Sequence, residues 1–267
     1  MRLGANRVLL ETDFRDSAEY LGILAGVIRE IRAGMPRPLR IQDPGFLRHI
    51  FSRGTGRMKI FLDEGDYRMF TFLLAEVVQE YDLECFDFCF IENHFHLSVR
   101  NRRRNLSAAM QKLKGEYGSY WNQRHGRVGH VFEGPFKDQL VQHDLYFRHL
   151  VRYIALNPVR ARLVAHPGDW PWSSYRFTAG LAPCPDFLCS RLVLEQLAGA
   201  DDASARNAYV DLIATPSTDL RAFELFRSRR RILGDAQFKA RFRPDAPKRP
   251  IARVSAADSS QFIHLPA

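Results

Sequence analysis

Residues 86–99 read FDFCFIENHFHLSV, which predicts two short strands interrupted around Glu92-Asn93. Side chains alternate between the two faces of a strand, so His94 and His96 project from one face and Phe95 from the other. We therefore expect Phe95 in the core and the two imidazoles together on the opposite side. Two imidazoles at this spacing can hold one divalent metal ion, although a His-x-His pair by itself is more often a polar, solvated face.

The composition is that of a globular protein with a basic surface. Of the 267 residues, 46% are hydrophobic and 12% aromatic, which is enough for a proper core. Lys and Arg outnumber Asp and Glu by 39 to 30, which gives a formal net charge of +9. This excess favours a polyanionic partner. Nucleic acid is favoured over an anionic membrane surface, because no basic amphipathic helix dominates the chain.

Cysteine usage and the N-terminal residues predict a cytoplasmic protein. Neither the Cys85/Cys89 spacing nor the Cys184/Cys189 spacing is that of a structural zinc site, and a reduced compartment fits both pairs. Acidic residues between Glu11 and Asp16 interrupt any signal-peptide core. No apolar stretch reaches the ~20 residues that a membrane span needs, so no membrane association is expected.

Apolar residues at helical spacing predict four helices in the first part of the chain, at Ser17–Arg32, Tyr67–Tyr81, Leu106–Trp121 and Leu145–Leu156. Phe46–Phe51 reads as a further strand, and Trp170–Tyr175 as an aromatic segment that closes the domain. From Phe187 onward the pattern is helical, including Leu192–Leu197, Ala205–Ile213 and Asp219–Leu233, with little strand signal. Residues 245–267 lack periodicity and are predicted to be a disordered tail.

The helix predicted at Leu145–Leu156 supplies a second group of candidate site residues. Positions i and i+4 share a helix face, so the Tyr153 phenol and the Asn157 carboxamide point together if the helix runs as far as Asn157. Tyr117 and Tyr120 are rival nucleophiles, but Tyr117 falls on the apolar side of its helix. The candidate site therefore contains two imidazoles, one phenol and one neutral amide oxygen.

Two basic segments are candidates for contacts with phosphate. Arg53-Gly54 opens a flexible turn that is able to approach another backbone closely. A run of three arginines follows the histidine-bearing strand, and we interpret its position as beside the paired histidines. Each arginine is as often ordinary solubilising charge, so DNA binding is an expectation for Arg53, Gly54, Arg102, Arg103 and Arg104.

With these motifs, the sequence resembles the single-tyrosine HUH transposases, which carry an IS200-like transposase domain, and within them the REP-associated tyrosine transposases. The resemblance runs from about Met35 to Gly180, and the order and spacing of the motifs agree with the family. The chain departs from the family at Ile91-Glu92, Ser98 and Arg162. The matching segments are Pro36–Ile41, Ser52–Gly54, Ile60–Asp63, Asn93–Leu97, Tyr153–Ala161 and Pro171–Tyr175.

The resemblance implies an α+β fold: a ferredoxin-like antiparallel sheet with helices on one face, plus a C-terminal helical extension. It places the transposase domain at residues 35–180 and the helical extension at 181–244, followed by the tail at 245–267. Related proteins commonly begin at a Met-x-Arg-Pro segment like that at Met35. Residues 1–34 are accordingly expected to be an upstream extension or the product of a mis-assigned start codon.

The resemblance also implies the chemistry. Tyr153 carries over as the nucleophile, and His94, His96 and Asn157 carry over as ligands of a divalent metal ion, Mg²⁺ or Mn²⁺. The implied activity is cleavage and rejoining of single-stranded DNA at hairpin, REP-like sequences through a 5′-phosphotyrosine intermediate. Two alternatives stay open: a hairpin-DNA-binding protein that no longer cuts, and a metal-dependent phosphodiesterase that uses water.

The expected partner is single-stranded or hairpin DNA, and the expected location is the cytoplasm, in association with the nucleoid. Relatives include both dimers and monomers, so a homodimer is one of two expected forms.

Overall fold

The computed structural model of the chain describes residues 41, 43–142, 145–198, 203–215 and 231–242. All of them except Ile41 belong to one compact unit that begins at Gln42. The helix expected at Ser17–Arg32 and the tail expected at 245–267 lie outside the described residues. Within the described residues, no helix has both the length and the apolar character needed to cross a membrane.

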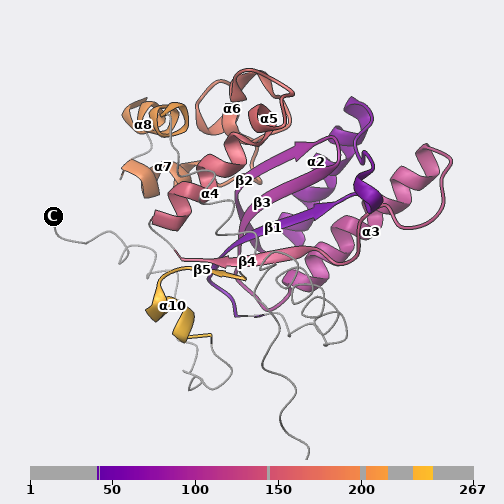
Figure 1. Cartoon of the computed structure of the whole chain (residues 1–267), viewed down its shortest axis with the longest axis horizontal. Helices are drawn as coiled ribbons and strands as arrows, with labels where there is room; N and C mark the ends of the chain where they lie inside the picture. Colours follow the sequence, from indigo (N-terminus) through magenta and orange to yellow (C-terminus); the bar gives the residue numbers. More distant parts are fainter. Residues whose placement is uncertain (1–40, 42, 143–144, 199–202, 216–230, 243–267) are drawn as a thin grey trace, which may run out of the picture. The chain divides into compact units, whose positions relative to one another are not determined.

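A five-stranded sheet with strand order β2-β3-β1-β4-β5 organises the fold (Figure 1). Each strand is antiparallel to its neighbours, except that β5 runs parallel to β4. The strands are β1 (Leu47–Arg53), β2 (Leu83–Ile91), β3 (His94–Asn101), β4 (Lys137–Val141) and β5 (Ile232–Leu233). The α-helices are α2 (Glu64–Glu80), α3 (Leu106–Arg124), α4 (Leu145–Ala155), α5 (Asn157–Arg160), α6 (Tyr175–Thr178), α7 (Ser190–Ala198), α8 (Ala203–Ala214) and α10 (Ala236–Ala240). Two short 3₁₀ helices, η1 (Thr55–Arg57) and η2 (Pro167–Asp169), complete the described elements.

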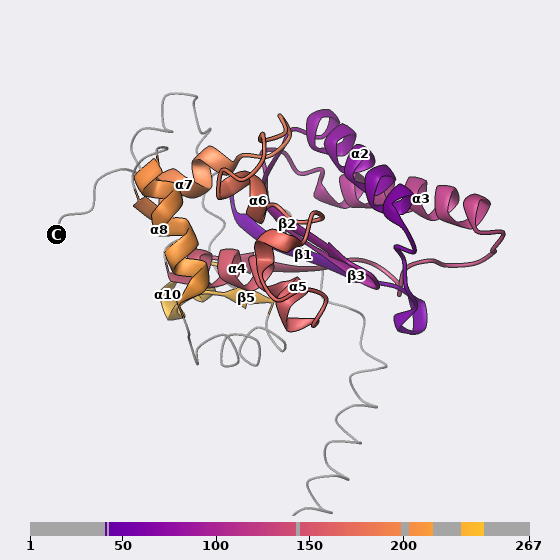
Figure 2. The same ribbon diagram turned by 90° about the horizontal axis from the view of Figure 1, so that it is seen from above.

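The expected α+β fold class, with helices toward the C-terminus, is confirmed, but the helices cover both faces of the sheet. Figure 2 shows α2 and α3 on one side of the strands and α4 and α5 on the other. Ile50 and Phe95 pack with residues of α2 and α3, whereas Leu47 and Cys89 pack with residues of α4, α7 and α8. The expectation of helices on one face was wrong, because every residue of β2 is buried and a strand apolar on both faces needs cover on both.

Residues after Gly180 pair with both β2 and β4, the outer strands of the antiparallel part of the sheet. At the β2 edge, the Phe90 amide donates to the Trp172 carbonyl at 2.9 Å, and the Cys189 amide donates to the Cys85 carbonyl at 2.7 Å. At the other edge, β5 lies within a range expected to be helical, so that part of the helix prediction was wrong. Covering the edges removes the unpaired backbone groups that would otherwise pair with another chain.

The aromatic segment after η2 closes the domain, as the sequence predicts. The indole of Trp170 donates to the Phe90 carbonyl at 2.9 Å. The ring of Trp172 stacks on that of Tyr67, with centroids 4.8 Å apart, and Tyr175 is buried. Trp170 and Trp172 therefore hold α2 and β2 together.

Candidate active site

The paired histidines lie on the face of the sheet that α4 covers. Phe95 is fully buried on the opposite face, among the residues that pack with α2 and α3, as strand alternation predicts. The rings of His94 and His96 lie 4.9 Å apart, centroid to centroid, with their planes at 85°. His96 is buried and His94 is half-buried, so the pair is accessible from one side.

Tyr153 of α4 lies against this pair. Its ring meets that of His96 edge-on, with the centroids 5.3 Å apart, and only 3% of the residue is exposed. The guanidinium carbon of Arg160 lies 5.0 Å from the centroid of the Tyr153 ring. The structure therefore brings together the phenol and the imidazoles that the sequence pairs, and adds a cation beside the phenol.

Asn157 lies one turn beyond Tyr153, where α5 begins. α4 ends at Ala155, so the helix does not run unbroken as far as Asn157, and Pro158 occupies the start of α5. Asn157 is buried, and its Oδ1 has no hydrogen-bond partner among the described residues. A buried amide oxygen without a hydrogen-bond partner is unusual in a folded protein. A water molecule or an ion bound to the oxygen would satisfy it.

Two imidazoles and a buried amide oxygen that has no partner in the described part of the chain are donor types that a divalent metal ion accepts. Within the described residues, no group of three or more His, Cys, Asp and Glu side chains is arranged to hold a metal. A site here would therefore combine the two imidazoles with the Asn157 oxygen. Imidazole and amide oxygen ligands suit Mn²⁺, whereas Mg²⁺ prefers an all-oxygen shell.

Two further buried polar residues, His49 and Gln139, lie on the α4 face of the sheet beside His96. The sequence alone does not indicate that they belong near the site. The His96 Nδ1 and His49 Nε2 atoms lie 2.9 Å apart, and His49 Nδ1 lies 3.0 Å from Gln139 Oε1. In the sheet, His49 of β1 stands opposite Gln139 of β4, and its neighbour Phe51 stands opposite His96 of β3. The alternation of β1 places His49 and Phe51 on one face, but only the strand register reveals their partners.

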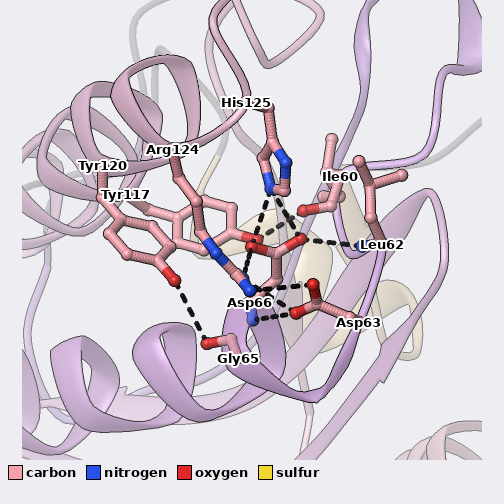
Figure 3. Close-up of polar contacts among 9 residues, drawn as sticks. All are labelled: Ile60, Leu62, Asp63, Gly65, Asp66, Tyr117, Tyr120, Arg124 and His125. Carbon is pink, nitrogen blue, oxygen red and sulfur yellow. Dashed lines mark hydrogen bonds and ion pairs between the residues drawn. The ribbon is translucent and has the colours of Figure 1, made fainter.

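The rival tyrosines lie on the other face of the sheet. Figure 3 shows Tyr117 and Tyr120 of α3 directed toward the start of α2, where the Tyr117 hydroxyl donates to the Ile60 carbonyl and the Tyr120 hydroxyl to that of Gly65. Burial raises the pKa of Tyr117 far above its ordinary value. Both hydroxyls are thus used to hold α3 against α2, away from the paired histidines.

The same close-up shows a cluster of charged groups where the end of α3 meets the start of α2 (Figure 3). The fully buried Asp66 accepts from the Leu62 amide at 2.8 Å and from Arg124 at 2.6 Å, and lies 3.0 Å from His125 Nε2. Arg124 also donates two hydrogen bonds to Asp63, both at 2.8 Å. These charged groups tie the end of α3 to the start of α2 and belong to the fold rather than to the candidate site.

Arg53 and Gly54 lie at the end of β1 next to the site. Arg53 is exposed and stands opposite His94 in the strand register. Gly54 is buried, and a Cβ there would collide with the Met58 carbonyl and lie 2.8 Å from Ile60 Cγ2. The structure thus gives Gly54 a packing role, and its contact with DNA stays a prediction.

The interpretation that Arg102, Arg103 and Arg104 lie beside the paired histidines was wrong. β3 begins at His94 and ends at Asn101, and at about 3.3 Å per residue the arginines lie roughly 20 Å along the strand from His96. Their guanidinium groups pair there with Glu84 at 2.7 Å, Asp82 at 3.3 Å and Asp43 at 3.0 Å. Their contact with DNA stays a prediction, but proximity to the histidines no longer supports it.

Comparisons with known proteins show which family the chain is similar to. Residues 46–157 match the family model described as "Transposase IS200 like". The chain is similar to the solved "Structure of the REP associates tyrosine transposase bound to a REP hairpin", with 19% identity, a TM-score of 0.48, and coverage of 57% of this chain and 93% of that chain. It is also similar to the "Crystal structure of tRNA(His) guanylyltranserase from Saccharomyces cerevisiae", with 10% identity, a TM-score of 0.36, and coverage of 73% and 82%. No curated protein matches the chain.

The matched range contains both histidines of β3, Tyr153 and Asn157. The family match, rather than either structural likeness, carries this similarity. Over residues 46–157 the chain is similar to the IS200-like transposases, a family of enzymes that cleave DNA.

Proposed function

We propose that this protein cleaves and rejoins single-stranded DNA at hairpin sequences, with Tyr153 as the nucleophile and a divalent metal ion held by His94, His96 and Asn157. The observation that carries this proposal is the 5.3 Å separation of the Tyr153 and His96 rings, which come from different elements. The hairpin specificity follows the REP-associated branch, which the sequence motifs resemble.

The cleavage step is a transesterification. The Tyr153 oxygen attacks phosphorus, a bond forms between them, and the bond from phosphorus to the 3′-oxygen breaks. The phenol proton is lost to solvent, and the departing 3′-oxygen takes up a proton, so that the products are a 5′-phosphotyrosine and a free 3′-hydroxyl. The covalent link keeps the energy of the broken bond, and the 3′-hydroxyl of a second strand reverses the step at a new junction.

The two imidazoles and the Asn157 amide oxygen would hold Mn²⁺ or Mg²⁺. When bound, the metal ion polarises the scissile phosphate and stabilises the charge that builds on its oxygens. The burial of Asn157 and its unsatisfied Oδ1 support a role as the third ligand. Three protein ligands leave positions open for phosphate oxygens.

Exposed cations near the site are suited to guide the sugar-phosphate chain. Arg53 stands opposite His94, and Arg160 lies beside the Tyr153 ring. We propose that these two arginines contact the phosphates that flank the cleaved bond. The pairs that Arg102, Arg103 and Arg104 form with carboxylates make those arginines weaker candidates.

The domain boundaries form part of the same proposal. We assign the catalytic domain to residues 35–180 and a helical extension to residues 181–244. The extension contributes strand β5 and the segment that pairs with Cys85, so it would stabilise the sheet that carries the site. An enzyme that acts on these sequences would work at the nucleoid, as a monomer or as a homodimer.

A denaturing gel and a native gel together distinguish this function from its two alternatives. The protein is incubated with Mn²⁺ and an end-labelled hairpin oligonucleotide that carries unpaired flanking bases, and the products are separated under denaturing conditions. A protein–DNA adduct that survives denaturation supports the transferase. Cleaved DNA free of protein identifies a phosphodiesterase that uses water, and a mobility shift on a native gel without cleavage identifies a binding protein.

A further inference from the structure

Three side chains from three adjacent strands form a buried hydrogen-bonded series on the α4 face of the sheet. Gln139 Oε1 of β4 lies 3.0 Å from His49 Nδ1 of β1, and His49 Nε2 lies 2.9 Å from His96 Nδ1 of β3. His49 is fully buried, and Gln139 and His96 are 4% and 3% exposed. The series therefore ends on one of the two imidazoles assigned to the metal ion.

With the Gln139 amide turned so that Oε1 faces His49, the chemistry of the three groups sets one direction of hydrogen-bond donation along the series. An amide oxygen only accepts hydrogen bonds, so His49 Nδ1 has to carry a proton and donate it to Gln139 Oε1. In a neutral imidazole the other nitrogen is then an acceptor, so His49 Nε2 accepts from His96 Nδ1. With its proton on Nδ1, His96 keeps the lone pair on Nε2, and a metal ion binds a nitrogen lone pair.

We propose that His49 and Gln139 are positioning residues that hold His96 in the Nδ1-protonated tautomer, so that Nε2 presents its lone pair to the metal ion. The metal-binding part of this inference rests on the proposed function, whereas the tautomer does not. A hydrogen bond to the second nitrogen of a ligating histidine commonly orients the ring and raises its affinity for the metal. Here the His49 imidazole, itself hydrogen-bonded to the Gln139 amide, would orient the His96 ring. A carboxylate or a backbone carbonyl is the more usual group in that position.

The packing around His49 holds its ring in place. The imidazole stacks on the Phe51 ring, with centroids 4.9 Å apart, and on the His96 ring at 5.0 Å. The backbone register sets Gln139 directly opposite His49. The ring stack and the strand register therefore hold the three side chains in place without a metal ion.

Three variants separate this role from ordinary packing. Gln139→Met removes the amide acceptor and leaves both imidazoles in place. His49→Phe keeps the ring stack and removes both nitrogens. His49→Gln restores an acceptor for His96 Nδ1, so it is the conservative variant expected to rescue the function. Thermal unfolding and circular dichroism establish which variants are folded, and Gln139→Met carries the test if His49→Phe does not fold.

The first measurement uses the metal-free full-length protein labelled with ¹⁵N-histidine. Long-range ¹H–¹⁵N correlation spectra report which ring nitrogen carries the proton, and the His96 signals are assigned with His96→Gln. We expect His96 to be protonated on Nδ1 in the wild type and in His49→Gln, and to lose this preference in His49→Phe and Gln139→Met. A wild-type His96 with its proton on Nε2 overturns the proposal.

The second measurement is the Mn²⁺ affinity of the same proteins, by isothermal titration calorimetry without DNA. We expect His49→Phe to weaken Mn²⁺ binding about 10- to 100-fold, Gln139→Met to weaken it less, and His49→Gln to restore it. The proposal is contradicted if His49→Phe and Gln139→Met both keep the wild-type Mn²⁺ affinity and the wild-type His96 spectra. A wild type that binds no Mn²⁺ defeats the metal-dependent function, while the spectra of the metal-free protein still decide the tautomer.

Discussion

The phenol ring of Tyr153, on α4, meets the imidazole of His96, on β3, edge-on with the ring centroids 5.3 Å apart. This contact joins two segments that are distant in the sequence and that each contain part of a candidate active site. In the proposed function, the strand would supply the metal-binding imidazoles and the helix would supply the nucleophile. Each part of this arrangement can be tested separately.

Asn157 is expected to matter for the metal ion and not for folding. Because its buried Oδ1 makes no hydrogen bond within the described residues, Asn157→Leu should leave the melting temperature unchanged or raise it. The same variant should weaken Mn²⁺ binding at least as much as loss of a supporting hydrogen bond does, about 10- to 100-fold. Calorimetric titration with Mn²⁺ measures the effect, and wild-type affinity in Asn157→Leu would exclude Asn157 as a ligand.

Gly54 is expected to be required for the structure at the end of β1. A Cβ at Gly54 collides with the Met58 backbone, so Gly54→Ala should destabilise the protein by about 1–3 kcal/mol, as overpacked sites do. Gly115 is a matched control, because it is an exposed residue inside α3 where an added Cβ would have no other group within 4 Å. Gly115→Ala should stabilise the protein by roughly 0.4–1 kcal/mol. Chemical denaturation of both variants measures the difference, and equal effects would contradict this account of Gly54.

Arg53 and Arg103 are expected to contribute differently to DNA binding. Arg53→Gln should weaken hairpin binding and lower the slope of log affinity against log salt by about 1, the change expected for one lost phosphate contact. Arg103 is paired with Asp82 at 3.3 Å and lies beyond the far end of β3, so Arg103→Gln should have the smaller effect. Fluorescence anisotropy at several salt concentrations measures both slopes. A larger loss of affinity in Arg103→Gln than in Arg53→Gln would indicate that DNA binds near the end of β3 that carries Arg103.

Asp87 makes the stability of the protein depend on pH. Burial raises the pKa of this fully buried carboxyl well above its usual range, although a hydrogen bond from the Ser174 hydroxyl acts in the opposite direction. A raised pKa in the folded state contributes stability that is complete below the unfolded value of about 3.9 and declines as the pH rises toward the folded value. Asp87→Asn has no such dependence, because asparagine resembles the protonated carboxyl and does not titrate.

The wild type should therefore lose thermal stability relative to Asp87→Asn as the pH is raised from about 4 to about 8. Melting temperatures of the two proteins across this range provide the measurement. A constant difference between them would mean that Asp87 keeps an ordinary pKa in the folded protein.

Local patterns in the sequence were sufficient to predict the strand and the helix that carry the candidate site residues. The alternation of His94, Phe95 and His96 predicts which side chains share a face, and strand geometry makes that prediction independent of the rest of the fold. The helical spacing of Tyr153 and Asn157 likewise places both near one another, although the helix breaks between them. Periodicity depends only on neighbours in the chain, so it can be read without knowledge of tertiary contacts.

Relationships between distant segments were beyond the reach of the sequence. The contact of His49 with Gln139 and His96 depends on the register of three strands, which no single segment encodes. The arginines after β3 follow the histidines in sequence, but an extended strand carries the chain away from the site. β5 has only two residues, too few for any alternation to be recognised.

The most direct test of the central claim is to identify the residue that becomes linked to DNA. The wild-type protein is incubated with Mn²⁺ and a hairpin oligonucleotide, digested with a protease, and the nucleotide-bearing peptide is sequenced by mass spectrometry, with Tyr153→Phe and Tyr120→Phe treated in parallel. We predict an adduct on Tyr153 in the wild type and in Tyr120→Phe, and at least a roughly 1,000-fold loss, of the order seen on removal of a catalytic nucleophile, in Tyr153→Phe. An adduct that persists in Tyr153→Phe, or one mapped to another residue of the wild type, would contradict the account.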